Sequence, residues 1–301
     1  MKTKISMIGM GNVGSVTAYA LAHKKIADEI VMLDVLKDLL EGHSLDLAHS
    51  LAWEEGTRAY HGDYTDIDGS RIVVVCAGAG RRSGLNRLVL AEQNAKIVTE
   101  IGASIKKHSP GAIVITLTNP VDVMNYVMWR ATGFPREKVL GQGNVLDSFR
   151  FRWAISQVIG AKPSEIEAFV IGEHGNSKVP LFSKVTVRGK PKELTIEERM
   201  KVTELIESSN ETIIKKKGGT VFGPTQAIVR MVDAIISDKK EMMPCSFVLK
   251  GEYGLKDLSI GVPVILGRNG VESVEEWTLD HAEEVSFKRS SELIQDTIGK
   301  V

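Results

Sequence analysis

The residue types best suited to acid–base chemistry lie in the second half of the chain. His174 stands in the glycine-rich segment Ile171–Gly175, directly after an apolar run that predicts a strand. A histidine has an ordinary pKa of about 6.5, so near neutral pH it can both give and take a proton. Asp147 and Arg150 are three residues apart in a segment with helical spacing, which places them on one helix face. The same spacing also suits an ordinary surface ion pair.

A glycine-rich segment near the start fits a dinucleotide-binding loop. The glycines of its G-x-G-x-x-G pattern are Gly9, Gly11 and Gly14, after an apolar run and before a helical one. The free N–H groups at that helix start would bind a pyrophosphate. Asp34 ends the second apolar run about twenty residues later, where a carboxylate accepts hydrogen bonds from the ribose hydroxyls of NAD and repels a 2′-phosphate. We therefore predict NAD rather than NADP, although Lys37 lies close by.

A second glycine-rich loop carries three arginines. The segment Gly78–Arg87 follows the apolar run Arg71–Ala77 and contains Arg81, Arg82 and Arg87. Guanidinium groups pair bidentately with carboxylate and phosphate, so the loop indicates an anionic ligand. Its glycines suit a segment that closes over a substrate. A solvated basic loop would have a similar composition.

The elements that position these loops alternate along the first half of the chain. The predicted strands are Lys4–Ile8, Glu29–Leu33, Arg71–Ala77 and Ala112–Leu117, and the predicted helices are Asn12–His23, Lys37–Leu51 and Leu88–His108. Nearly continuous apolar strands separated by helices predict an α/β fold with a doubly wound parallel Rossmann sheet. In such a sheet ligands bind beyond the carboxyl ends of the strands, where these loops lie.

The alternation weakens after about Gly141, which predicts a second domain. We expect a NAD-binding Rossmann domain at residues 1–142 and an α+β catalytic, substrate-binding domain at 143–301. The strands predicted in the second part are Ile166–Ile171, Lys184–Val187, Met243–Leu249 and Ile260–Leu266. The predicted helices are Leu146–Ile159, Ile196–Lys217, Gly223–Ser237 and Thr278–Ile298.

The composition excludes several classes of protein. The 38 Lys and Arg residues equal the 38 Asp and Glu residues, so the chain lacks the basic excess of a typical nucleic-acid binder. Its 43% hydrophobic content is unlike that of a disordered chain. Cys76 and Cys245 are too few for a disulfide framework, which favours a reducing, cytoplasmic compartment. No apolar run approaches the roughly 20 residues of a membrane helix. We therefore expect neither a nucleic-acid nor a membrane partner.

One triplet has the spacing of a metal-binding helix face. His43, Asp46 and His49 are three residues apart, but no fourth ligand of suitable spacing is evident. A helix surface or a subunit contact explains them better. We therefore predict no metal site.

These motifs together resemble the lactate/malate dehydrogenase family from end to end, and within it the lactate-dehydrogenase-like malate dehydrogenases. The matching segments are MIGMGNVG (Met7–Gly14), Leu33-Asp34, DLAHS (Asp46–Ser50), CAGAGRRSGLNR (Cys76–Arg87), TNPVDVM (Thr118–Met124), GQGNVLDSFRFR (Gly141–Arg152) and IGEHGNSKVP (Ile171–Pro180). Their order and spacing cover both halves of the chain, so the match is specific to this family.

The resemblance implies a role for each matching residue. His174 would exchange the proton, Asp147 would stabilise its protonated form, and Arg87 would polarise the reacting carbonyl. Arg150 would bind the C1 carboxylate of the substrate, and Asn119 would orient the carbonyl and the nicotinamide. The other implied positions are Thr220 in the substrate pocket and, against the cofactor, Gly9, Met10, Gly11, Asn12, Val13, Gly14, Asp34, Asn94, Leu117 and Asn119.

The resemblance also makes the substrate depend on Arg81. This position faces the substituent beyond the carbonyl, and it is commonly glutamine in lactate dehydrogenases and arginine in malate dehydrogenases. Against the methyl group of pyruvate, the enclosed charge of Arg81 would have no partner, at a cost of about 3–5 kcal/mol. We therefore expect a NAD-dependent malate dehydrogenase of the tricarboxylic acid cycle with a small dicarboxylate substrate, assembled as a homotetramer or homodimer. If Arg82 pointed inward instead, the assignment would shift by one residue.

Three other functions compete with this interpretation. The first is a lactate, or other 2-hydroxy acid, dehydrogenase of the same family. The second is a NAD-dependent glycosidase, which needs a metal held by cysteine and histidine, yet neither Cys76 nor Cys245 neighbours a histidine in the sequence. The third is a non-catalytic NAD sensor, and the complete catalytic set argues against it: Asp147, Arg150, His174 and Arg87.

Overall fold

One sheet of nine strands passes through both halves of the molecule, in the order β14-β13-β12-β6-β5-β4-β1-β2-β3. The structure is a computed structural model that describes residues 2–53, 56–80 and 87–301. The six strands at one end of this order run parallel to one another. They are β3 (Arg58–His61), β2 (Glu29–Leu33), β1 (Lys4–Ile8), β4 (Ile72–Val75), β5 (Ile113–Thr116) and β6 (Val139–Gly141). The predicted doubly wound Rossmann sheet is confirmed.

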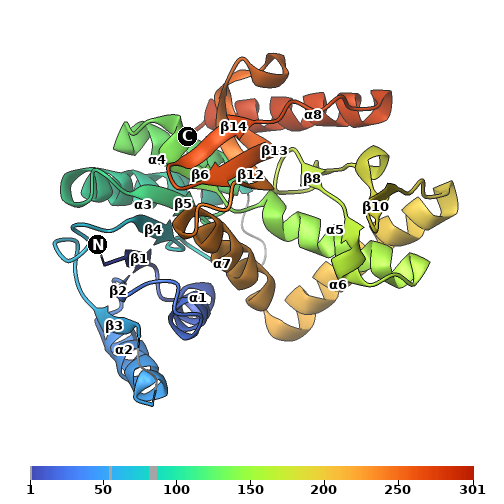
Figure 1. The fold of residues 1–301 in the computed structure, drawn as a ribbon. Helices are drawn as coiled ribbons and strands as arrows, with labels where there is room; N and C mark the ends of the chain where they lie inside the picture. Colours follow the sequence, from blue (N-terminus) through green and yellow to red (C-terminus); the bar gives the residue numbers. More distant parts are fainter. Residues whose placement is uncertain (1, 54–55, 81–86) are drawn as a thin grey trace.

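Helices cover both faces of this parallel sheet, as the apolar strands require. The helices of the first half are α1 (Asn12–His23), α2 (Lys37–Leu51), α3 (Arg87–His108) and α4 (Val121–Thr132). Helices α3 and α4 pack against each other on one face, and α1 packs against α7 (Phe222–Ile236) on the other (Figure 1). A helix from the second half of the chain thus covers part of the first-half sheet.

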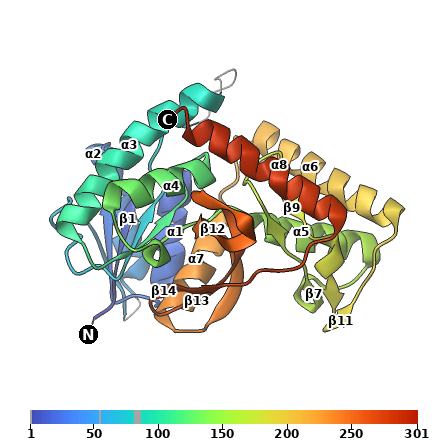
Figure 2. The same ribbon diagram turned by 90° about the horizontal axis from the view of Figure 1, so that it is seen from above.

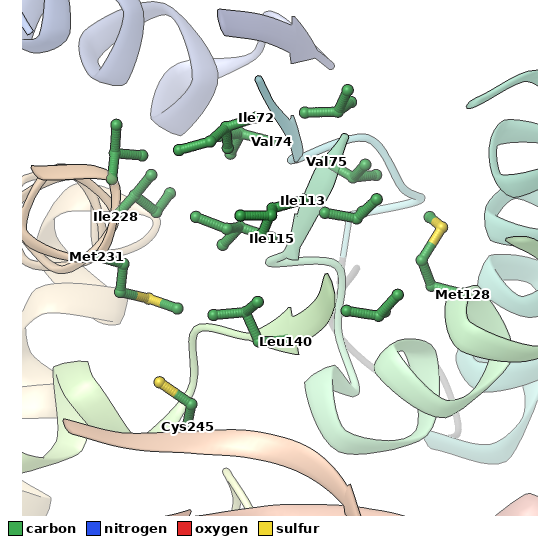
Figure 3. Close-up of a cluster of buried hydrophobic side chains, with 14 of the residues drawn as sticks. Ile72, Val74, Val75, Ile113, Ile115, Met128, Leu140, Ile228, Met231 and Cys245 are labelled. Carbon is green, nitrogen blue, oxygen red and sulfur yellow. The ribbon is translucent and has the colours of Figure 1, made fainter. Parts of the chain in front are cut away.

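The core lies where α7 meets the centre of the sheet. Ile72 and Val74 of β4 and Ile113 and Ile115 of β5 project toward Ile228 and Met231 of α7 (Figure 3). Val75 projects from the opposite face, on the side of Met128 of α4. Cys245 joins the buried cluster, and burial raises the pKa of its thiol. The side chains alternate between the two faces because successive residues of a strand point in opposite directions.

The second half extends the same sheet with antiparallel strands. These are β12 (Glu241–Lys250), β13 (Lys256–Gly267) and β14 (Gly270–Val274), and β12 joins β6 through the pairing of Ser246 with Gly141. The α+β part that we expected after residue 142 is present, but its long strands continue the Rossmann sheet instead of forming one of their own.

The remaining elements belong to the second half of the chain. Helices α5 (Asn144–Ile159), α6 (Ile196–Lys217) and α8 (His281–Ile298) lie beside two small sheets, one of β7 (Ile166–Glu167), β10 (Thr186–Val187) and β11 (Lys190–Pro191), the other of β8 (Val170–Ile171) and β9 (Val179–Pro180). Helix α8 packs on β13 and contacts both α4 and β9 (Figure 2). Among the described residues, no helix has the length and apolar character to cross a membrane.

Candidate active site

The glycine loop between β1 and α1 is shaped by close backbone contacts. Gly9 has φ +95°, and a Cβ at this position would collide with the backbone of Ala77. A Cβ on Gly14 would collide with the carbonyl oxygen of Gly9. By contrast, no described atom lies within 4 Å of the Cβ position of Gly11. Gly9 and Gly14 therefore allow the chain to pack on itself, while Gly11 leaves open space at the loop surface.

The start of α1 has the free donors that a pyrophosphate needs. Gly11 is the N-cap residue, and it provides no side-chain hydrogen bond to the first turn of Asn12–His23. Unpaired N–H groups and the positive end of the helix dipole favour an anion at such a position. The open space at Gly11 and these donors together fit the diphosphate of NAD.

The carboxylate of Asp34 is fixed beside the glycine loop. Its Oδ2 accepts the backbone N–H of Met10 at 2.6 Å, and its Oδ1 accepts that of Leu36 at 2.9 Å. Each carboxylate oxygen has a further lone pair that can accept a hydroxyl. Asp34 is thus fixed beside the glycine loop with room to accept further hydrogen bonds, and its role in binding a ribose stays a prediction.

Asn94 ties the arginine loop to the end of β5. Its side chain is buried, its Oδ1 accepts the N–H of Ala79 at 2.7 Å, and its Nδ2 donates to the carbonyl of Asn119 at 2.7 Å. Leu117 follows the last residue of β5, and its N–H donates to the carbonyl of Val75 at the end of β4. Asn94 therefore holds the backbone of two loops that border the predicted cofactor site.

His174, Asp147 and Arg150 form one connected cluster. Nδ1 of His174 lies 2.7 Å from Oδ2 of Asp147, and Nη1 of Arg150 donates to Oδ1 of Asp147 at 3.3 Å. Asp147 lies in the first turn of α5 and is 3% exposed. The two groups that share a helix face thus meet a histidine from a distant loop, as the family resemblance implies.

The contacts within this cluster determine the protonation of His174 and Asp147. Burial of the imidazole opposes its positive charge, but the charge and the hydrogen bond of Asp147 outweigh burial and raise the pKa of His174. Burial also acts to raise the pKa of Asp147, but His174 and Arg150 outweigh it and hold the pKa of this carboxyl below its usual range. The arrangement therefore favours an imidazolium paired with a carboxylate.

Several contacts that sequence reasoning missed hold the loop of His174. Oδ2 of Asp122, in the first turn of α4, accepts the backbone N–H of His174 at 2.7 Å. Nδ2 of Asn144 donates to the carbonyl of Gly172 at 3.0 Å, and the backbone N–H of Glu173 donates to the hydroxyl of Ser290. The one available signal was a charged Asp122 within the apolar stretch Val121–Met124.

Arg150 and Thr220 line one cavity of about 370 Å³ between α5, α6 and α7. The rest of its wall includes Phe149, Trp153, Ile213 and Phe222. Neither His174 nor Asp147 lines this cavity, and the substrate-binding roles of Arg150 and Thr220 stay predictions. Arg81 and Arg82 lie outside the described residues, and for Arg87 the structure gives its place at the start of α3 but not its side chain. Their roles stay predictions.

Within the described ranges, no three His, Cys, Asp or Glu side chains are grouped so that they could hold a metal ion. His43, Asp46 and His49 lie on α2. Cys76 lies in the part of the chain that follows β4, whereas Cys245 lies in β12. The two thiols are free, and burial raises the pKa of the Cys76 thiol to about 12.

Comparison with known proteins identifies the family. The lactate/malate dehydrogenase NAD binding domain matches residues 3–141, and the alpha/beta C-terminal domain of the same family matches residues 144–301. The chain belongs to the lactate/malate dehydrogenase family. As a member of it, the protein is a NAD-dependent 2-hydroxy acid dehydrogenase.

Relatives within this family carry both substrate names. A malate dehydrogenase of Natronomonas pharaonis is 39% identical, over 99% of this chain and 99% of its own. An L-lactate dehydrogenase of Thermoanaerobacter pseudethanolicus is 37% identical, again over 99% of both chains. The crystal structure of Cryptosporidium parvum malate dehydrogenase superposes with a TM-score of 0.94 at 34% identity, covering 99% of this chain and 98% of that one.

A lactate dehydrogenase of Cryptosporidium parvum, solved with lactic acid and NAD, superposes with a TM-score of 0.93 at 33% identity, over 99% of this chain and 98% of that one. Neither the fold nor the degree of identity therefore separates the two substrates within this family.

Proposed function

We propose that the protein is a malate dehydrogenase, which interconverts malate and oxaloacetate with NAD. The observation that carries the proposal is the His174–Asp147–Arg150 cluster, in which one buried carboxylate contacts both an acid/base group and a carboxylate-binding group. The choice of malate over lactate depends on Arg81 in the arginine loop.

Arg150 orients the substrate. Arg150 lines the cavity that Thr220 also lines, where its guanidinium would bind the C1 carboxylate through two hydrogen bonds. A fixed carboxylate aims the neighbouring carbonyl at His174, and such positioning lowers the barrier of the chemical step. NAD, when bound, supplies the hydride chemistry at the carbonyl carbon. Asp34 and the start of α1 are the groups of this chain that would hold it.

His174 exchanges the proton with the substrate. In the direction of oxaloacetate reduction, the imidazolium donates its proton to the carbonyl oxygen, and in the reverse direction the neutral imidazole removes it from the hydroxyl. Asp147 stabilises the imidazolium at 2.7 Å. Arg87 would stabilise the negative charge that develops on oxygen, an effect commonly worth about 3–4 kcal/mol.

Arg81 selects the dicarboxylate. A guanidinium at this position would pair with the second carboxylate of oxaloacetate, whereas pyruvate would leave its charge enclosed and unpaired. With Arg87 and Arg150 it gives a chain of zero net charge a positive site for a small dianion.

We also propose a domain division, an oligomeric assembly and a cellular compartment. We divide the chain into a NAD-binding domain at residues 1–142 and a catalytic domain at 143–301, supported by the family matches that end at 141 and begin again at 144. The assembly would be a homotetramer or homodimer in the cytoplasm, in the tricarboxylic acid cycle. Light scattering tests the assembly.

The decisive experiment compares oxaloacetate and pyruvate as oxidants of NADH and of NADPH. We expect kcat/KM for oxaloacetate with NADH to exceed that for pyruvate by at least about a hundredfold, which corresponds to the cost of an enclosed, unpaired charge. Equal efficiencies with the two oxo acids would contradict malate as the substrate. Faster turnover with NADPH would contradict the role of Asp34.

A further inference from the structure

The catalytic histidine is held by two carboxylates from two different helices. Asp147 of α5 contacts the ring at Nδ1, and Asp122 of α4 accepts the backbone N–H of the same residue at 2.7 Å. Asp122 is 2% exposed, so its interaction with His174 is screened little by water. The two contacts fix both the ring and the backbone of His174.

Asp122 lies close in the chain to Asn119, the residue expected to orient the substrate carbonyl. It lies in the first turn of α4, directly after the Asn119–Pro120 pair, and Asn94 holds the carbonyl of Asn119. The start of α4 therefore connects the end of β5 with the loop of His174. A displacement of Asp122 would move two parts of the site with respect to each other.

The charges around His174 show how Asp122 acts. Asp147 and Asp122 favour the imidazolium, and Arg150 opposes it. The negative charge of Glu173, on the same loop as His174, acts to raise the pKa of Asp122. The positive charge of Lys178 acts to lower the pKa of Asp147. Burial raises the pKa of Asp122 to about 6, against the hydrogen bond from the backbone N–H of His174 and the charge of His174. Asp122 is therefore predominantly ionised above neutral pH.

We propose that Asp122 is a positioning residue for His174, which fixes its backbone and, as a buried negative charge, favours its protonated form. The inference rests on the proposed function of His174 as the acid/base group. It assigns to α4 a part in catalysis without contact between Asp122 and the substrate.

The test separates the charge of Asp122 from its hydrogen bond. Asp122→Asn keeps an oxygen that can accept the N–H of His174 but removes the charge, whereas Asp122→Ala removes both. We expect the imidazole of His174, followed by NMR with labelled histidine, to titrate at lower pH in Asp122→Asn than in the wild type. In the same variant kcat/KM for oxaloacetate reduction should fall roughly three- to tenfold on the alkaline side, because one pKa unit is a factor of ten in the protonated fraction. Asp122→Ala should in addition lower kcat at every pH.

Asn125→Ala is the matched control. Asn125 lies one turn further along α4, is fully buried, and hydrogen bonds to Ser246 and Ser259. Its truncation should lower the melting temperature but leave the titration of His174 unchanged. The same shift in this control, or an unshifted His174 in Asp122→Asn, would overturn the proposal.

A wild-type measurement covers the case in which the variants do not fold. The backbone amide resonance of His174 should move as Asp122 ionises, with a midpoint near pH 6. An amide resonance that shows no such transition would refute the contact. These titrations need no turnover, so they remain decisive even if the enzyme proves inactive with oxaloacetate and the proposed function fails.

Discussion

Nδ1 of His174 lies 2.7 Å from Oδ2 of Asp147, although the two residues come from different elements of the second half. The other oxygen of the same carboxylate accepts a hydrogen bond from Arg150. One buried aspartate thereby fixes the spacing between a proton donor and a carboxylate-binding group. A small 2-oxo acid has its carbonyl and its carboxylate on neighbouring carbons, so a proton donor and a carboxylate-binding group that share one partner suit such a molecule.

Loss of the Asp147 charge should prevent His174 from acting as the proton donor but leave cofactor binding intact. In Asp147→Asn the amide cannot stabilise the imidazolium, so we expect kcat/KM for oxaloacetate reduction to fall by roughly 10²- to 10⁴-fold. Binding of NADH, measured by calorimetry, should stay within a few fold of the wild type. Glu173→Gln is the control, because this neighbouring carboxylate contacts Ser177 and not the ring, and it should retain most of the activity. A loss below tenfold in Asp147→Asn would contradict the role of Asp147.

The rates of the two reaction directions should have opposite dependence on pH. The pKa of His174 is raised above its ordinary value of about 6.5. Oxaloacetate reduction requires the imidazolium, so its kcat/KM should be constant at low pH and fall as pH rises through that pKa. Malate oxidation requires the neutral ring and should rise over the same interval. Profiles with the same direction in both reactions would exclude His174 as the group that exchanges the proton.

Two glycines of the first loop should respond differently to alanine. A Cβ at Gly14 collides with the carbonyl of Gly9, so Gly14→Ala should lower the melting temperature markedly. Gly11→Ala meets no described atom within 4 Å and should melt like the wild type, but its methyl group occupies the space assigned to the diphosphate. We expect at least a tenfold rise in the Kd for NADH in Gly11→Ala, measured by fluorescence titration. Unaltered binding would place the diphosphate elsewhere.

The preference for NAD should depend on the charge of Asp34. In Asp34→Asn the repulsion of a 2′-phosphate is removed, and we expect the ratio of kcat/KM for NADPH to that for NADH to rise at least about tenfold. Asp38→Asn, which removes a carboxylate from the first turn of α2, serves as the control and should leave the ratio unchanged. Equal changes in both variants would indicate a general electrostatic effect of the region.

The choice between malate and lactate should reverse with one residue of the arginine loop. Arg81→Gln should raise the ratio of kcat/KM for pyruvate to that for oxaloacetate by more than about a hundredfold, since an enclosed charge without a partner is removed. Arg82→Gln is the matched control. If the control produces the change instead, the inward-facing residue is Arg82 and the assignment shifts by one position.

Local patterns were sufficient to predict most of the parallel sheet. Four elements begin and end at the predicted residues, because the strands are mostly apolar and the helices have a regular spacing: β1, β2, α1 and α2. Three elements of the first half were missed for physical reasons, and strands β9, β11 and β14 of the second half were missed as well. Strand β3 is an edge strand without an apolar run, β6 has three residues, and α4 follows a proline.

Side-chain contacts over long sequence separation were harder to predict. The spacing of Asp147 and Arg150 indicates a shared helix face, but only the fold brings His174 to that face. The same holds for Asp122, whose partner is the backbone of a residue in another loop. A predicted strand at Ile166–Ile171 is divided into β7 and β8, which pair with different neighbours, because tertiary contacts override a local apolar run.

The position of α7 has a consequence for how the molecule folds. Ile228 and Met231 of this helix complete the core over β4 and β5, and the β6–β12 pairing continues the backbone ladder across the two halves. The nucleotide-binding half by itself would expose an apolar sheet face and an unpaired strand edge, both of which promote aggregation. We therefore expect the nucleotide-binding domain to depend on the second half of the chain for its solubility, although the two carry different parts of the site.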